Sequence, residues 1–133
     1  MRKQLCTALL VRSSNPDMVF LTGDLGFMAL EPLRDCMGQR FINAGVAEQN
    51  MISVAAALAK QHLEVWVYSI APFCYARPFE QIRNDICFHK LSVKLIGNGG
   101  GVWLRGHGSD ASRHRRLRRV VDAPKHVCIR TGF

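Results

Sequence analysis

The stretch from residue 40 to residue 60 constrains the fold of this chain more than any other segment. A short apolar run, Phe41 and Ile42, is followed by Gly45, and Glu48 then opens a helix rich in alanine. A strand, a tight turn and a helix in this order are typical of a parallel α/β sheet, which binds its ligands at the carboxyl ends of its strands. The pattern therefore predicts that Glu48 lies at a ligand-binding edge.

The same alternation of short apolar strands and helices continues through the first 101 residues. We expect helices at residues 3–12, 31–37, 47–61 and 79–88, and strands at residues 18–21, 40–43, 64–68 and 93–96. Strands separated by helices form parallel sheets with right-handed crossovers. The predicted fold class is therefore α/β, a parallel sheet with flanking helices.

Composition narrows the class of protein further. A length of 133 residues with 48% hydrophobic residues suits one domain with a real core. No apolar run approaches the ~20 residues of a membrane-spanning helix. The five cysteines form no Cys-x-x-Cys pair, and most lie in apolar surroundings, which favours buried, reduced thiols and a cytoplasmic location. No cluster of residues has the spacing of a metal site.

The residues around Glu48 also resemble the pyrimidine-binding domain of the transketolase family. The sequence Gly45-Val46-Ala47-Glu48-Gln49 is similar to the Gly-Val/Ile-x-Glu motif of that family, and the resemblance extends in order from about Arg2 to Gly101. It implies a thiamine-diphosphate-binding fold of the transketolase pyrimidine-domain type over residues 1–101, incomplete at the C-terminus.

The resemblance gives Glu48 a catalytic role. In the family this glutamate contacts N1′ of the aminopyrimidine ring of thiamine diphosphate and activates the cofactor, which needs one well-placed, poorly solvated carboxyl group. Taken without the surrounding motif, Glu48 could equally be a glutamate that interacts favourably with the dipole of its helix.

Three further residues are candidates for cofactor binding by resemblance. The family has an aromatic side chain after the third strand that stacks on the aminopyrimidine ring, and Phe73 is the first choice for it, with Tyr75 the second. Either could instead pack in the core. The segment around Asp24 resembles an Asp-Leu element near the cofactor, although Gly-Asp after a strand is also a common turn.

The implied protein is a fragment of a thiamine-diphosphate-dependent, transketolase-like enzyme that transfers two-carbon ketol units between phosphosugars. The Gly-Asp-Gly…Asn motif that holds the diphosphate and Mg²⁺ in the family is missing here. The resemblance therefore implies a partner subunit that carries the diphosphate-binding domain, a homodimer or heterotetramer, and a chain that is inactive alone. The sequence Ala47-Glu48-Gln49 is also similar to that of deoxyxylulose-5-phosphate synthases, so a fragment of such a synthase is an alternative.

Residues 102–133 differ from the rest of the chain. They hold eight basic and two acidic side chains and so carry +6 of the net charge of +8. A basic arm that binds nucleic acid through its phosphates is one interpretation.

A shifted reading frame is the interpretation that we favour for this tail. Synonymous codons for residues 102–119, read after the loss of one G, can encode Tyr-Gly-Tyr-Gly-Val-Met-Gly-Ala-Thr-His-His-Ala-Ile-Glu-Asp-Tyr-Gly, which resembles the family's continuation. We therefore expect residues 102–133 to be frameshifted and disordered.

Overall fold

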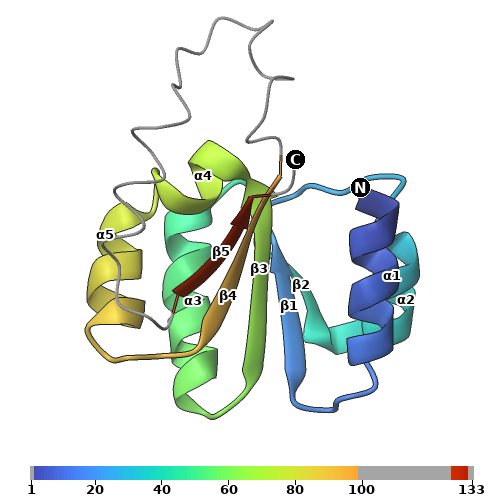
Figure 1. Ribbon diagram of the computed structural model, residues 1–133, viewed down its shortest axis with the longest axis horizontal. Helices are drawn as coiled ribbons and strands as arrows, with labels where there is room; N and C mark the ends of the chain where they lie inside the picture. Colours follow the sequence, from blue (N-terminus) through green and yellow to red (C-terminus); the bar gives the residue numbers. More distant parts are fainter. Residues whose placement is uncertain (1, 99–126, 132–133) are drawn as a thin grey trace, which may run out of the picture.

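A computed structural model describes residues 2–98 and 127–131, and its strands form one parallel sheet in the order β2-β1-β3-β4-β5 (Figure 1). The strands are β1 (Met18–Thr22), β2 (Phe41–Asn43), β3 (Glu64–Ile70), β4 (Val93–Asn98) and β5 (Val127–Thr131). Helices α1 (Arg2–Arg12) and α2 (Glu31–Met37) lie on one side of the sheet. Helices α3 (Glu48–Lys60), α4 (Ala71–Tyr75) and α5 (Phe79–Gln81) lie on the other. The predicted α/β fold class is confirmed.

Both faces of the central strands are buried, because helices cover each side. In β1, Met18 and Phe20 join the apolar cluster beneath α1 and α2, whereas Val19 and Leu21 join the cluster beneath α3 and α4. All five residues of β1 are buried. A strand buried on both faces needs a continuous apolar run rather than an alternating one, and the sequence of β1 supplies it.

Helix α3 packs through a stripe of small and medium apolar residues at helical spacing. Met51, Ile52, Ala55 and Ala56 are buried against the sheet. The alanines let the helix approach the strands closely, and they also favour the helical conformation. The helix begins at Glu48, so its first residue is held at the carboxyl edge of the sheet.

The structure differs from the predicted elements in three places. The helix expected at residues 79–88 is a short α5 followed by a π-helix, η2 (Ile82–Cys87). Helix α4 was not predicted, since five residues containing Pro72 show no helical period. Arg40 belongs to a 3₁₀ turn, η1 (Gly38–Arg40), which precedes β2.

Strand β5 departs from the expectation of disorder in residues 102–133. Residues 127–131 pair in parallel with β4, from Val93 beside Val127 to Gly97 beside Thr131. The segment contains β-branched residues, which favour the extended conformation, and β4 offers it an open edge. Residues 127–131 thus form a strand within the segment expected to be disordered, whereas residues 102–126 and 132–133 lie outside the described part of the chain. A frameshifted, disordered tail stays a prediction.

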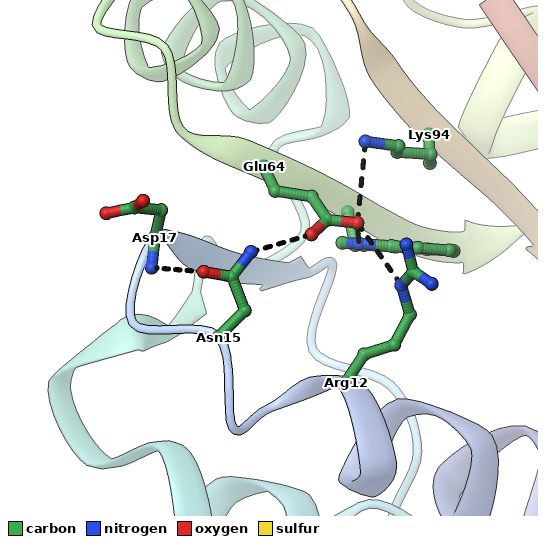
Figure 2. Close-up of polar contacts among 6 residues, drawn as sticks. Arg12, Asn15, Asp17, Glu64 and Lys94 are labelled. Atoms are coloured by element: carbon green, nitrogen blue, oxygen red, sulfur yellow. Dashed lines mark hydrogen bonds and ion pairs between the residues drawn. The ribbon is translucent and has the colours of Figure 1, made fainter.

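A polar cluster around Glu64 lies at the amino end of the sheet (Figure 2). Its carboxylate accepts hydrogen bonds from Asn15 at 3.0 Å and from the indole of Trp66 at 3.1 Å. Arg12 and Lys94 make ion pairs with the same carboxylate, at 3.3 and 3.6 Å. The cluster joins the end of α1 to β3 and β4. No helix in the described ranges is long and apolar enough to cross a membrane.

Candidate functional site at the carboxyl ends of the strands

The loops that follow β1, β2 and β3 meet at one edge of the sheet. Asp24 lies in the turn after β1, Glu48 is the first residue of α3 after β2, and Phe73 lies in α4 after β3, so the three come from different parts of the sequence. Since β1 lies between β2 and β3, the loop after β1 is the one that links the other two. The carboxyl edge of a parallel sheet is where α/β proteins bind their ligands.

Asn43, the last residue of β2, ties the first two loops together. Its side-chain amide donates a hydrogen bond to Asp24 Oδ1 at 2.8 Å, and its Oδ1 accepts hydrogen bonds from the backbone N–H groups of Asp24 (3.1 Å) and Gly45 (3.0 Å). Asp24 and Gly45 both have positive φ, 57° and 67°. Asn43 therefore holds two tight turns in register, and sequence reasoning gave it no role.

Glu48 is the one buried carboxylate of this edge among the described residues, with 2% of its surface exposed. Its Oε2 accepts a hydrogen bond from Arg77 Nη1 at 2.8 Å, in an ion pair. Its Oε1 points toward Gly23, where a Cβ would lie 3.7 Å away. A buried carboxylate needs such a partner, because an unpaired charge in this position is costly.

Ser69 lies beside Glu48 and was also missed by sequence reasoning. It is fully buried, and its Oγ is one of the buried polar atoms that have no hydrogen-bond partner in the described residues. A Cβ on Gly23 would lie 3.2 Å from Ser69 Oγ and 3.7 Å from Glu48 Oε1, so any side chain at position 23 would crowd both oxygens. The signal available in the sequence was a serine that directly follows the run from Val65 to Tyr68. Buried hydroxyls normally have partners, so the unpartnered Oγ of Ser69 is an exception that a polar ligand atom would satisfy.

The segment after β3 separates the two aromatic candidates. Phe73 is partly buried, and the Arg77 guanidinium carbon lies 4.2 Å from the centroid of its ring. Tyr75 is buried in the apolar cluster beneath α3. The ring of Phe73 is thus available for stacking at this edge, whereas that of Tyr75 packs in the core. Arg77 is the charged residue of residues 69–78, a signal that could have singled it out.

Cys74 lies between these aromatics and is unsuited to nucleophilic chemistry. Burial raises the pKa of its thiol to about 12; a backbone hydrogen bond at Ser69 lowers the pKa by less, and the nearby charge of Glu48 raises it by less still. The thiolate is the nucleophilic form of cysteine, so Cys74 is inert at neutral pH. Cys6 and Cys87 are also buried and free, whereas Cys36 is free and exposed.

Asp24 also borders a pocket of about 280 Å³ between β1, β2 and α2. The lining includes Phe27, Glu31 and Arg34, but it does not include Glu48 or Phe73. The structure therefore brings Glu48 and Phe73 together through Arg77, and it places Asp24 at the neighbouring pocket. No group of three metal-binding side chains occurs in residues 2–98.

Comparisons with known proteins agree with this architecture. The family described as "Transketolase, pyrimidine binding domain" matches residues 7–122. One subunit of the apulose-4-phosphate transketolase from Phocaeicola vulgatus is 30% identical over 151 aligned positions, which cover 95% of this chain and 48% of that protein. The 1-deoxy-D-xylulose-5-phosphate synthase of Mycobacterium sp. (strain KMS) is 34% identical over 102 residues, 76% of this chain and 15% of the synthase.

A solved structure shows the same fold. It is described as "Split gene transketolase, inactive beta4 tetramer" and superposes with a TM-score of 0.65 at 35% identity, over 73% of this chain and 33% of that one. The chain spans about half the length, or less, of the curated relatives it matches. By the match to the family over most of its length, this chain belongs to the transketolase pyrimidine-binding domain family.

Proposed function

We propose that this chain forms the pyrimidine-binding part of a thiamine-diphosphate-dependent enzyme that transfers two-carbon ketol units between phosphosugars. The observation that supports it best is Glu48, a carboxylate with 2% exposure at the carboxyl edge of the sheet, next to the accessible ring of Phe73 and the unpartnered hydroxyl of Ser69. Membership of the pyrimidine-binding family supports the cofactor.

These residues fit an aminopyrimidine ring. Such a ring is flat, and it has a ring nitrogen that can hydrogen-bond to a carboxyl group and an exocyclic amino group that can donate to an oxygen. Glu48 would hold the ring nitrogen, Phe73 would stack on the ring face, and Ser69 Oγ would accept a hydrogen bond or donate one to a polar ring atom. When bound, thiamine diphosphate supplies the electron sink for the transfer of a two-carbon unit.

The protein's own contribution in this proposal is to hold a proton at a defined atom. Glu48 has little contact with water, so a hydrogen bond between its carboxyl group and a ring nitrogen is stronger than it would be in solvent. Gly23 contributes by leaving no side chain between Glu48 and Ser69. Tyr75 acts as a core residue, and Asp24 borders the adjacent pocket.

We also propose a partner subunit that carries the diphosphate-binding domain and Mg²⁺. Phe27, Met28 and Val46, in the loops after β1 and β2, are 84%, 78% and 73% exposed at the edge that carries Glu48. Large apolar side chains gathered near a binding edge are typical of a surface that another protein covers. The relative in Phocaeicola vulgatus is one subunit of its transketolase, and the solved split-gene relative is described as inactive as a β4 tetramer.

The test of this function is the Glu48→Gln variant of the full chain, assayed together with the subunit that carries the diphosphate-binding domain. We expect ketol transfer from a ketose phosphate to an aldose phosphate to fall roughly 10²–10⁴-fold, because an amide cannot hold the proton at the ring nitrogen. Glu80→Gln, on the exposed face of α5, is the matched control. Equal activity of Glu48→Gln and the unchanged chain would refute the role of Glu48.

The similarity to 1-deoxy-D-xylulose-5-phosphate synthase suggests an alternative function, which the same assay tests through its product. The synthase of Mycobacterium sp. shares 34% identity over 76% of this chain. Formation of 1-deoxy-D-xylulose 5-phosphate instead of ketol transfer would assign the chain to that activity. Either product would require the same Glu48.

A further inference from the structure

We infer that the guanidinium of Arg77 occupies the position that the proposed function gives to the aminopyrimidine ring, so that Arg77 must leave this position before the ring can bind. The inference rests on the proposed function and adds a self-bound state of the same site. It is carried by two contacts of one side chain: Arg77 stacks on Phe73, and it pairs with Glu48.

Arg77 contacts Phe73 and Glu48 in the two ways expected of the aminopyrimidine ring, by stacking and by hydrogen bonding. The guanidinium carbon lies 4.2 Å from the centroid of the Phe73 ring, and Nη1 lies 2.8 Å from Glu48 Oε2. A guanidinium is planar, stacks on aromatic faces and donates N–H groups in its own plane to a carboxylate. An aminopyrimidine stacks and hydrogen-bonds in the same two ways. Arg77 therefore uses both surfaces that the ring would need.

Burial explains why the site holds its own side chain in the free protein. Glu48 is 2% exposed and would be a nearly buried, unpaired carboxylate without Arg77. Such a group destabilises the folded state, so the pair is retained until a ligand replaces it. The Arg77 side chain is 44% exposed, which leaves it free to move into solvent, where its charge is hydrated.

The hydroxyl of Ser69 has no hydrogen-bond partner among the described residues when Arg77 fills the site, and it would gain one when a ligand does. Arg77 binds Oε2 of Glu48, whereas Ser69 Oγ, on the side of Gly23, keeps no partner in the described residues. A guanidinium thus satisfies the carboxylate and the aromatic face but leaves the hydroxyl unused. A ring that reaches all three groups gains a hydrogen bond that Arg77 does not make, and this gain offsets the loss of the ion pair.

Competition between Arg77 and a ligand has a measurable consequence. A protein that is binding-competent for only a fraction of the time shows an affinity reduced by that fraction. If Arg77 fills the site for about nine-tenths of the time, its removal raises the apparent affinity about tenfold. The same removal lowers stability, because Glu48 loses its partner. Opposite changes in affinity and stability are the mark of a self-bound side chain, since a purely structural arginine would lower both.

The experiment uses the full chain and 4-amino-5-hydroxymethyl-2-methylpyrimidine as the probe, with its dissociation constant measured by NMR titration and stability by thermal unfolding. For Arg77→Ala we expect a dissociation constant about tenfold lower and a lower unfolding midpoint. Arg77→Lys keeps the charge but cannot stack as a plane, so its dissociation constant should lie between the two. Arg83→Ala, an exposed arginine on η2, is the matched control and should change neither value.

The possible results separate this inference from the proposed function. Unchanged or weaker binding by both Arg77 variants would overturn the inference while the pyrimidine site itself stands. No binding of the probe by any variant would overturn the pyrimidine site and, with it, the inference. If Arg77→Ala does not fold, Arg77→Lys alone decides, because tighter binding supports the inference and equal or weaker binding refutes it.

Discussion

Asn43 and Asp24 are joined by two reciprocal hydrogen bonds, one from the Asn43 amide to the Asp24 carboxylate and one from the Asp24 backbone N–H to the Asn43 carbonyl oxygen, at 2.8 and 3.1 Å. The pair connects the turn after β1 to the turn after β2. Both Asp24 and Gly45, which Asn43 also binds, lie in the left-handed region of backbone conformation. One side chain therefore sets the spacing of the loop that precedes Glu48.

The first prediction concerns this connection. Asn43→Ala removes three hydrogen bonds, and we expect the free energy of unfolding to fall by about 1–3 kcal/mol, measured by urea denaturation. Asn84→Ala, an exposed asparagine on η2, is the control and should change stability by less than about 0.5 kcal/mol. Equal effects of the two substitutions would show that Asn43 does not hold the loops.

The second prediction concerns the close approach of β4 and α4. A Cβ on Gly97 would lie 2.9 Å from the Cα of Ala71, a backbone atom that cannot move aside alone. Gly97→Ala should therefore lower the free energy of unfolding by about 1–3 kcal/mol, measured by urea denaturation. The idea fails if Gly97→Ala is as stable as the unchanged chain.

The third prediction is a pH dependence that arises from Glu64. Burial by itself raises the pKa of Glu64, but the hydrogen bonds from Asn15 and Trp66 and the charges of Lys94 and Arg12 outweigh it, so the pKa lies below its usual value of 4.5. A carboxyl group with a lowered pKa in the folded state stabilises the fold above its unfolded pKa. That stabilisation is lost as the pH falls below about 4.5 and through the folded pKa.

Urea denaturation at a series of pH values checks this prediction. The unchanged chain should lose stability between neutral pH and the acid range more steeply than Glu64→Gln, which lacks the titrating group. Glu80→Gln removes one exposed carboxylate from α5 and controls for the change in net charge. Parallel curves for the unchanged chain and Glu64→Gln would contradict the assignment.

The fourth prediction concerns the cysteines. Burial and a pKa of about 12 make Cys74 unreactive in the folded chain, whereas Cys36 is exposed. Treatment of the native protein with iodoacetamide at about pH 8, followed by peptide mass spectrometry, should show Cys36 alkylated well before Cys6, Cys74 and Cys87. In urea all four should react at similar rates. Rapid alkylation of Cys74 in the native protein would show that the segment of α4 and the turn after it, which carry Phe73 and Arg77, opens.

The fifth prediction concerns residues 102–133, for which a shifted reading frame remains our proposal. The family match reaches residue 122 and so includes the first part of this segment. Strand β5 lies in the second part, beyond the match. Sequencing of the gene across codons 97–133 and beyond decides the question. We expect that deletion of one G opens a frame that continues into Thr-His-His-Ala-Ile-Glu-Asp. An early stop codon in that frame would make the basic segment genuine, and salt-dependent binding to nucleic acid would then be the property to test.

The order of elements was predictable from the sequence because it depends on local patterns. The apolar runs of β1, β3 and β4 and the buried stripe of α3 are read directly from spacing, and α2 begins and ends where the sequence predicts. Glu48 was also identified from the sequence, since a glycine turn and the motif around it point to the end of a strand. We expected Glu48 to be buried, because activation of the cofactor needs a poorly solvated carboxyl group.

The tertiary structure decided which side chains meet Glu48. Arg77 is 29 residues away along the chain, Ser69 lies near the end of β3 and Gly23 follows β1, so no local pattern brings these groups together. It also separates the two aromatic candidates in space, because Tyr75 packs beneath α3 whereas the ring of Phe73 stacks with Arg77. Sequence patterns report the local periodicity of burial, whereas contacts at the edge of a sheet depend on the order of its strands. That order is a property of the whole fold.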